Sequence, residues 1–166
     1  MAELDRDLRS IQEARDLASQ AFAAWKQWST ASQELVDRVC AAMSAAALTA
    51  SERLGILAHE ETGYGVAEHK HLKNIFASKN VWESIKDVRT VGIVGHDPDR
   101  RTYDIAWPVG VIAALTPSTN PTSTVIFKIL VAVKARDAII IAPHPSAAKC
   151  SYEAACIMAQ AAEQNG

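Results

Sequence analysis

The chain has 166 residues, of which 49% are hydrophobic and 22% charged, and its formal net charge is −2. This composition is typical of a globular protein with a hydrophobic core and argues against a disordered chain. The mild acidity, without a basic stripe, argues against nucleic-acid and anionic-membrane partners, because nothing would neutralise their phosphates.

No stretch reaches the roughly 18 apolar residues that a membrane span needs. The start, MAELDRDLRS, also lacks the charged-then-apolar order of a signal peptide. The three cysteines, Cys40, Cys150 and Cys156, form no CxxC pair, which favours reduced thiols. We therefore expect a cytoplasmic protein without disulfides. No metal site is expected either, because His69 and His71 would point about 200° apart on a helix.

Residues 1–88 are predicted to form an N-terminal helical segment. Apolar residues recur at three- and four-residue steps between Asp5 and Trp28, which predicts an amphipathic helix with one buried stripe. That stripe consists of Leu4, Leu8, Ile11, Ala18, Phe22 and Trp25. A second, alanine-rich helix is expected to start near residues 30–32 and to run beyond Met43.

Two more helices are expected before residue 88. One covers residues 51–60 and ends at the glycines of Thr62-Gly63-Tyr64-Gly65, which tolerate a positive φ. The other covers residues 66–85. Its predicted inner face is apolar and consists of Leu72, Ile75, Phe76, Val81, Trp82 and Ile85.

Residues 89–107 are predicted to form a β-hairpin, because the β-rich runs 91–94 and 102–106 flank the turn-prone residues 95–100. The pattern then changes. Residues 109–115 form a nearly continuous apolar run, typical of a strand buried on both faces of a parallel sheet. A helix over residues 122–135, a second buried strand over 138–142 and a helix over 146–164 follow, with Gly166 placed to cap the last helix.

The predicted fold class is therefore α/β: N-terminal helices, a β-hairpin, and the first βαβα unit of a Rossmann-like cofactor-binding domain in residues 108–166. Two parallel strands make a very small sheet, so we interpret the domain as incomplete. An exposed sheet edge and an unpaired apolar face are expected as a result. Ligands of such sheets bind at the carboxyl ends of the strands, where the turns 116–121 and 143–146 both lie.

The first turn places Ser118, Thr119 and Asn120 between two prolines that stiffen the backbone. Hydroxyl and amide donors held in this way could stabilise negative charge on a substrate. The simpler alternative is that one of these side chains caps the following helix. No GxGxxG fingerprint or nucleotide P-loop is present, so a dinucleotide site would be non-standard.

The second turn, Pro143-His144-Pro145, is rigid, and its histidine could donate to a ribose hydroxyl or a phosphate. Alternatively, His144 is simply an exposed loop residue. Cys150 and Cys156 fall within the last predicted helix, where cysteine usually packs as a small apolar residue. Neither has a suitably spaced base, so neither is predicted to be a nucleophile.

From Pro108 onward the sequence PVGVIAALTPSTNPTSTVIFKILVAVKARDAIIIAPHPSAAK resembles the aldehyde dehydrogenase superfamily, and in particular its CoA-acylating branch. That branch includes acetaldehyde dehydrogenases and the N-terminal half of bifunctional aldehyde-alcohol dehydrogenases. The resemblance also covers residues 60–65 (EETGYG) and 71–79 (HLKNIFASK). Its most specific parts are residues 116–124 (TPSTNPTST) and 142–145 (APHP).

In the wider superfamily the first turn reads PWNFP, and its asparagine helps to hold the oxyanion. Without a gap that asparagine falls on Thr119, with Asn120 one place later, so the resemblance assigns oxyanion stabilisation to these two residues together. A lysine and a glutamate that hold the adenine ribose in non-acylating members are replaced here by Ala142 and Pro145, which fits the acylating branch. The cofactor contacts implied by the resemblance are Thr116, Pro117, Ser118, Pro143, His144, Pro145 and Ser146.

The resemblance implies an oxidoreductase that converts a short aldehyde, with NAD and CoA, to acyl-CoA through a cysteine thiohemiacetal. Acetaldehyde is the expected substrate and a homo-oligomer the expected assembly. The nucleophilic cysteine and the catalytic domain are expected outside these 166 residues, so this stretch alone is predicted to be inactive. Two alternatives are a truncated, non-catalytic binding or assembly module and a stand-alone nucleotide-binding domain.

Overall fold

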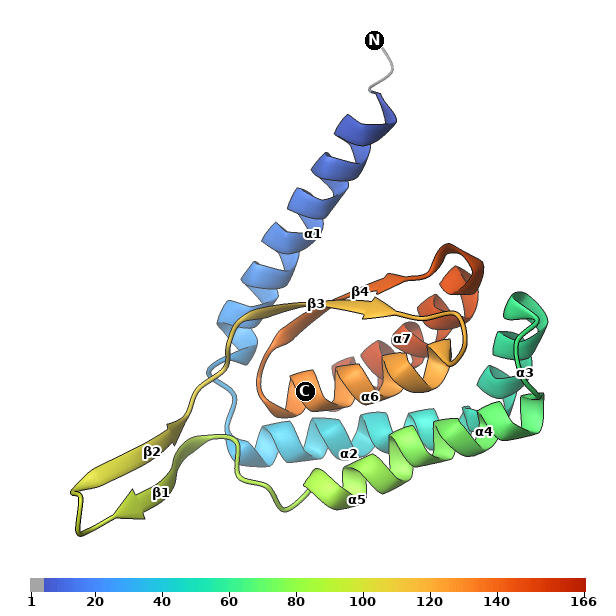
Figure 1. Cartoon of the computed structure of the whole chain (residues 1–166). Coiled ribbons are helices and arrows are strands. Elements are labelled where there is room, and N and C mark those ends of the chain that lie inside the picture. Colours follow the sequence, from blue (N-terminus) through green and yellow to red (C-terminus); the bar gives the residue numbers. More distant parts are fainter. Residues whose placement is uncertain (1–4) are drawn as a thin grey trace.

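A computed structural model of the chain describes residues 5–166. Its helices are α1 (Arg6–Trp28), α2 (Gln33–Thr49), α3 (Ser51–Thr62), α4 (Ala67–Ile75), the π-helical turn η1 (Phe76–Asn80), α5 (Val81–Ile85), α6 (Pro121–Lys134), the 3₁₀ turn η2 (Pro145–Ala147) and α7 (Ala148–Glu163). Its strands are β1 (Gly92–Asp97), β2 (Thr102–Ala106), β3 (Val111–Thr116) and β4 (Ala138–Pro143). The expected α/β order of elements is therefore confirmed (Figure 1).

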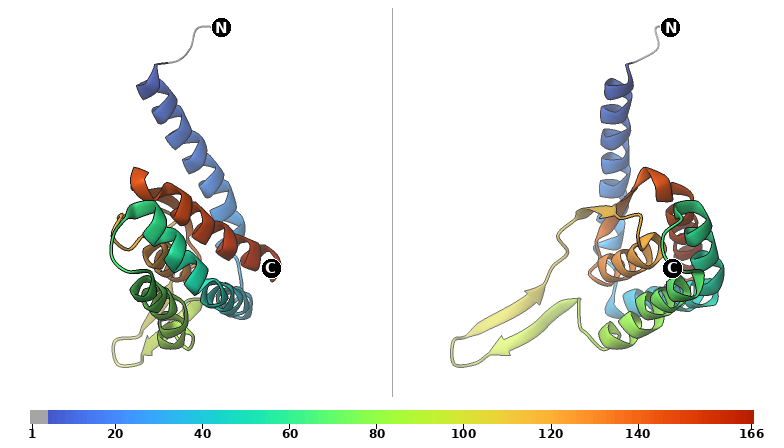
Figure 2. Two further views of the ribbon diagram at one scale, coloured as in Figure 1. Left: turned by 90° about the vertical axis from the view of Figure 1, so that its right-hand side faces the viewer. Right: turned by 45° about the vertical axis from the view of Figure 1, so that its right-hand side comes forward.

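The strands form two separate pairs. β1 and β2 are antiparallel and form the predicted hairpin, which projects away from the body of the molecule (Figures 1 and 2). Its turn is shorter than predicted, because β1 continues through residues 95–97. The Asp97 carboxylate shapes this turn by accepting from the N–H groups of Asp99 and Arg100, each at 3.0 Å.

β3 and β4 are parallel and connected by α6, as the βαβ pattern predicted. Their register runs from Val111 beside Ala138 to Thr116 beside Pro143, so both strands end at the same level. The helices α6 and α7 pack against one another and against α2, and their apolar faces form the main core. The largest fully buried apolar side chains in it are Met43, Leu54, Ile126, Leu130 and Met158.

Two predicted helix ends are confirmed by their capping geometry. The Ser32 hydroxyl accepts from the Leu35 N–H at 3.2 Å and starts α2. Gly63 ends α3 in the left-handed conformation, with φ 67°, and donates its N–H to the His59 carbonyl. The prediction for Gly166 was wrong, because α7 already ends at Glu163 with Gln164 as its C-cap.

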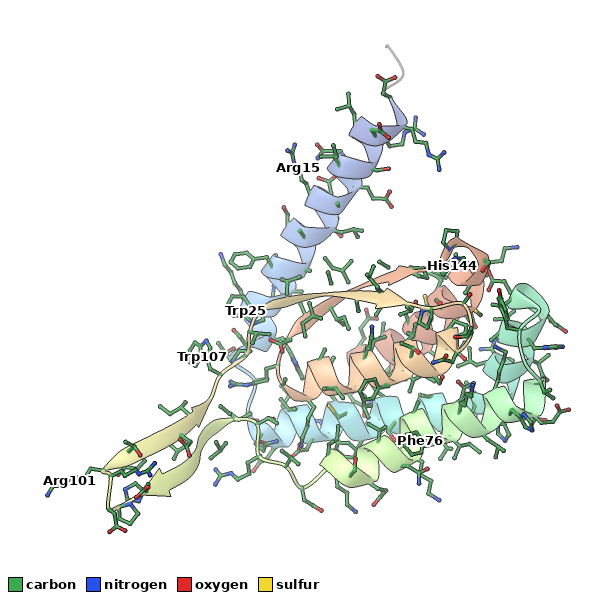
Figure 3. All side chains as sticks on the ribbon, viewed as in Figure 1. Arg15, Trp25, Phe76, Arg101, Trp107 and His144 are labelled. Atoms are coloured by element: carbon green, nitrogen blue, oxygen red, sulfur yellow. The ribbon has the colours of Figure 1, made fainter. Side chains whose placement is uncertain are left out.

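The predicted buried stripe of α1 is exposed. Leu8, Ile11 and Phe22 are each about half exposed, and α1 has no buried residue. Leu4, the first residue of the predicted stripe, lies outside the described residues. The physical reason is that α1 projects from the body, and only its last turns, which include Trp25 and Trp28, reach β3 and β4 (Figures 1 and 3).

The predicted inner face of residues 66–85 was also partly wrong. Leu72 is 60% and Phe76 65% exposed, and Figure 3 shows Phe76 on the outer side of this segment. The π-helical turn η1 adds a residue to the helical repeat at this point and shifts which side chains face inward. Most of the buried positions before α5 are instead polar: Lys70, Asn74 and Ser78.

β3 was predicted to be buried on both faces, but only one face is buried here. Ala114 and Thr116 are buried, whereas the intervening Leu115 is 76% exposed. Both α6 and α7 lie on the buried side, and α1 reaches the other side only with its last turns. The expected unpaired apolar face is therefore present. Within residues 5–166, no helix combines the length and apolar character needed to cross a membrane.

Candidate functional site

The two proline-containing turns predicted to form a site lie next to each other. The parallel register places Thr116 beside Pro143, and the His144 N–H donates to the Thr116 carbonyl at 3.0 Å. The Thr116 hydroxyl is buried and has no hydrogen-bond partner. A buried hydroxyl without a partner lowers stability, and the described residues supply no hydrogen-bond partner for this one.

The first turn is ordered by hydrogen bonds among its own side chains. The Thr119 hydroxyl donates to Asn120 Oδ1 at 2.8 Å, and Asn120 Nδ2 donates to the Thr124 hydroxyl at 3.0 Å. Asn120 occupies the N-cap position of α6, yet its side chain accepts no N–H of that helix. The simple capping alternative is therefore not observed. A carboxamide nitrogen carries two hydrogens, so one Asn120 N–H remains available to a ligand.

Two lysines that the sequence did not single out hold the backbone of this turn and of the strand residue before it. Lys70 Nζ donates to the Thr119 carbonyl at 3.0 Å, and Lys128 Nζ donates to the Leu115 carbonyl at 2.5 Å. Lys70 belongs to α4 and Lys128 to α6, so the turn is attached to two different helices. The sequence signal for Lys70 is a polar residue at four-residue spacing from Asn74 and Ser78, a pattern that normally indicates an exposed face.

The second turn holds His144 in a defined orientation at the end of β4 (Figure 3). His144 Nδ1 accepts from the Ser146 N–H at 3.2 Å and lies 2.8 Å from the Ser146 hydroxyl. Because Nδ1 is an acceptor, the neutral ring carries its proton on Nε2. The ring is exposed, so this N–H is accessible to a ligand and both interpretations of His144 are compatible with the geometry.

The N-terminus of α7, directly after this turn, is occupied by a carboxylate. Glu61 accepts from the N–H groups of Lys149 and Cys150 at 2.8 and 2.7 Å. Burial by itself raises the pKa of Glu61, but these hydrogen bonds and the charge of Lys149 outweigh it and hold the pKa below its ordinary value. These N–H groups are therefore already paired with a carboxylate and do not offer the anion site that a helix N-terminus otherwise provides.

Asn120 also lines an apolar cleft of about 440 Å³. Its walls come from α4, η1, α5 and the first turns of α6, and they consist of Leu72, Lys73, Phe76, Ala77, Val81, Asn120, Ser123, Thr124 and Phe127. Leu72 and Phe76, which are exposed, form part of these walls. Asn120, whose amide nitrogen keeps one unused N–H, is among the residues that line this apolar cleft, and an amide donor there suits polarising the carbonyl of a small apolar molecule.

Of the two cysteines in the last helix, Cys150 is buried as predicted and Cys156 is partly exposed; Cys40 in α2 is also buried. Burial raises the pKa of Cys40 to about 12. Burial and the neighbouring Glu61 carboxylate raise the pKa of Cys150 to about 12. Neither forms a thiolate at neutral pH, and thiolates are the reactive form. Among residues 5–166, no three His, Cys, Asp or Glu side chains come together in a way that could hold a metal ion.

Comparison with known proteins gives consistent matches. A model of the aldehyde dehydrogenase family matches residues 5–166. Over 153 residues the chain is 39% identical to the bifunctional aldehyde-alcohol dehydrogenase of Escherichia coli, covering 92% of this chain and 17% of that protein. An acetylating aldehyde dehydrogenase from Geobacillus thermoglucosidasius superposes with a TM-score of 0.94 at 53% identity, covering 99% of this chain and 36% of that one.

A third match is a propionaldehyde dehydrogenase from Rhodopseudomonas palustris, whose structure contains bound CoA and an acylated cysteine. It is 28% identical, with a TM-score of 0.72, and the match covers 91% of this chain and 34% of that chain. The fold and its two adjacent turns define an incomplete Rossmann-like α/β domain of the kind found in acylating aldehyde dehydrogenases. The chain belongs to the aldehyde dehydrogenase family, and it spans less than a fifth of the bifunctional relative.

Proposed function

We propose that the protein to which this chain belongs oxidises a short aldehyde, with NAD and CoA, to the corresponding acyl-CoA and NADH. The observation that carries the proposal is the Asn120 amide, which has one unused N–H and lines an apolar cleft in a chain whose relatives are acylating dehydrogenases. When bound, NAD supplies the acceptor for a hydride and CoA the acceptor for the acyl group. The thiohemiacetal would form on a cysteine outside this chain.

Asn120 is the better candidate than Thr119 for stabilising the oxyanion. The single hydroxyl proton of Thr119 is already donated to Asn120 Oδ1, whereas one of the two Asn120 amide hydrogens is free. Asn120 also lines the cleft, and Thr119 does not. We assign Asn120 as the donor and Thr119 as the group that orients its amide.

Matched variants separate these two roles. In the complete gene product, Asn120→Ala is expected to lower kcat by roughly 10²–10³-fold, the usual effect of losing one oxyanion donor. Thr119→Val keeps the donor and loses only its orienting hydrogen bond, so kcat should fall by less than about 10-fold. The reverse order of effects would transfer the donor role to Thr119.

The described residues fit a nucleotide in part. Ser118 and the His144 Nε2–H offer accessible polar groups at the ends of β3 and β4, and the buried Thr116 hydroxyl lies behind them. Pro117, Pro143 and Pro145 fix the backbone around these groups, and Ser146 fixes the imidazole. We assign these residues to binding NAD or CoA. Because Glu61 fills the N-terminus of α7, the phosphates must be held elsewhere.

We assign the cleft to the substituent of the aldehyde. Its walls are mainly apolar, with Phe76 and Phe127 among them, so a short alkyl group such as the methyl of acetaldehyde would be accommodated. The decisive experiment is an assay of NADH formation by the complete gene product with acetaldehyde and NAD, with and without CoA. CoA-dependent NADH is expected. A rate independent of CoA would exclude the acylating reaction, and no NADH under either condition would favour a non-catalytic module.

A further inference from the structure

The helix α4 and the turn η1 direct a row of polar side chains into the interior. Lys70 is 3% exposed, and Asn74 and Ser78 are fully buried. These residues are four apart and therefore lie on one helical face, directly opposite α6 and the turn that precedes it. None of the three lines the cleft described above, so their burial requires a separate explanation.

The row contacts the chain on both sides of Asn120. Lys70 Nζ donates to the Thr119 carbonyl at 3.0 Å. One helical turn further on, Asn74 Oδ1 accepts from the buried Thr122 hydroxyl at 2.8 Å. Asn120 lies between the two anchored residues, so its backbone is fixed on either side.

Asn74 is itself held from two directions. Its side-chain Nδ2 donates to the Ser51 carbonyl at 2.9 Å, and its backbone carbonyl accepts from the Ser78 hydroxyl at 2.7 Å. The anchor of the turn is thus continuous with the start of α3 and with η1. A buried polar network in which the members satisfy one another is rigid and specifies a single arrangement.

The burial of the Lys70 ammonium is unfavourable for the stability of the fold. Burial, and then the neighbouring charge of Lys73, lower the pKa of Lys70, which shows that its charge is disfavoured where it lies. An apolar side chain of similar length would fill the same space without this cost, and such replacements are often neutral or stabilising. The advantage of a lysine here is the directed hydrogen bond to the Thr119 carbonyl.

We infer that Lys70, supported by Asn74, is a positioning residue that holds the Thr119–Asn120 backbone so that the Asn120 amide stays over the cleft. The catalytic consequence of this inference rests on the proposed function, whereas the positioning of the turn by Lys70 is independent of it. Lys70 acts on the backbone carbonyl of Thr119 and is not among the residues that line the cleft.

The experiment compares three variants of the complete gene product. Lys70→Met removes the ammonium and keeps the length of the side chain, and Thr122→Val removes the second anchor. Lys79→Met, which alters an exposed lysine in the adjacent turn η1, is the control. For each protein we would measure kcat, the KM values for aldehyde and NAD, the melting temperature, and hydrogen exchange of peptides covering residues 115–124.

For Lys70→Met we expect faster exchange in residues 115–124 and an unchanged or raised melting temperature. We also expect kcat to fall about 10- to 100-fold, because small misplacements of catalytic groups slow the reaction by this order, with little change in either KM. Thr122→Val should change exchange and kcat in the same direction, and Lys79→Met should change none of the four. A merely structural role for Lys70 would lower the melting temperature and spare kcat in the folded fraction.

The two possible failures are distinguishable. If the unmodified protein formed no NADH with aldehyde and CoA, the proposed function would fail, while the hydrogen-exchange comparison would still test the positioning. If the unmodified protein were active and Lys70→Met exchanged and turned over like Lys79→Met, the role of Lys70 would be refuted.

Discussion

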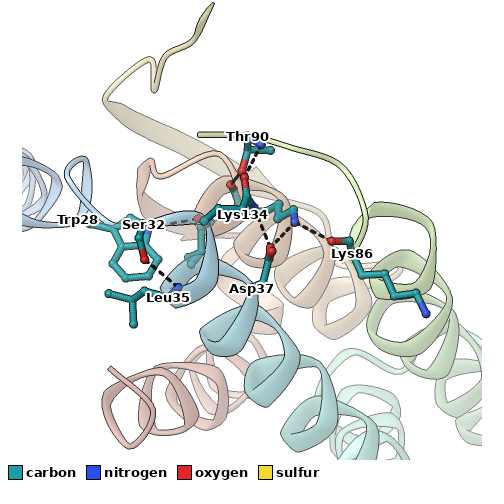
Figure 4. A network of polar contacts seen from close by, with 9 residues as sticks. Trp28, Ser32, Leu35, Asp37, Lys86, Thr90 and Lys134 are labelled. Carbon is teal, nitrogen blue, oxygen red and sulfur yellow. Dashed lines mark hydrogen bonds and ion pairs between the residues drawn. The ribbon is translucent and has the colours of Figure 1, made fainter. Parts of the chain in front are cut away.

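The ion pair between Asp37 and Lys134 gives the sharpest prediction about stability. Lys134 Nζ lies 2.5 Å from Asp37 Oδ1 and donates to the Lys86 carbonyl at 3.0 Å (Figure 4). It also lies 5.6 Å from the centre of the Trp82 ring. The Thr90 hydroxyl donates to the Lys134 carbonyl, so the end of α6, the start of α2 and the chain before the hairpin meet here.

Asp37→Ala would leave the Lys134 ammonium buried without a counter-ion. Breaking a buried pair in this way typically costs ~3–5 kcal/mol. The Lys134 side chain is 4% exposed but that of Asp37 is 35% exposed, so water can partly replace the carboxylate and the lower end, about 3 kcal/mol, applies. The double variant Asp37→Ala/Lys134→Met removes the uncompensated charge and should recover most of this loss.

Urea unfolding of the complete gene product, followed by tryptophan fluorescence, measures these differences in the free energy of unfolding. They appear as shifts of the urea concentration at the midpoint, with the slope of free energy against urea unchanged. Arg53→Ala is the matched control, because the Arg53–Glu153 pair is exposed, with side-chain exposures of 60% and 37%. It should cost less than about 1 kcal/mol. The reasoning is refuted if Asp37→Ala costs no more than this control, or if the double variant is as unstable as the single one.

Two further predictions concern titratable groups. Glu61→Gln should destabilise the protein by ~1–2 kcal/mol at neutral pH, because the charge-assisted bonds to the α7 N-terminus are lost. The lowered folded pKa of Glu61 means that its contribution is complete above the ordinary glutamate pKa and disappears as pH falls through the folded value, so melting curves of both proteins should converge in acid. Iodoacetamide labelling at neutral pH, mapped by peptide mass spectrometry, should spare Cys40 and Cys150, whose pKa values burial raises to about 12; rapid labelling of either in the folded protein would contradict the assignment.

Local sequence signals predicted the order of elements well. The hydroxyl of Ser32 and the left-handed Gly63 mark helix ends by short-range chemistry, and the apolar runs before Thr116 and Pro143 mark parallel strands. The place of the two turns at one sheet edge followed from the same pattern, because parallel strands align their carboxyl ends.

The remaining features depend on contacts that a local pattern does not contain. The π-helical turn η1 shifted the inner face, so Leu72 and Phe76 line a cleft instead of the core. Lys70 is separated from its partner Thr119 by 49 residues, and Glu61 from the Cys150 N–H by 89, so neither pairing has a sequence signature. Buried polar residues at helical spacing also look like a solvated face until the fold brings their partners to them.

The most direct test of the proposed function is to measure the acyl product itself. The complete gene product would be incubated with acetaldehyde, NAD and CoA, and acetyl-CoA, acetate and NADH would be quantified together. We expect acetyl-CoA and NADH in equal amounts, with no acetate above the control that lacks enzyme. Acetate formed in step with NADH, with the CoA left unused, would contradict it.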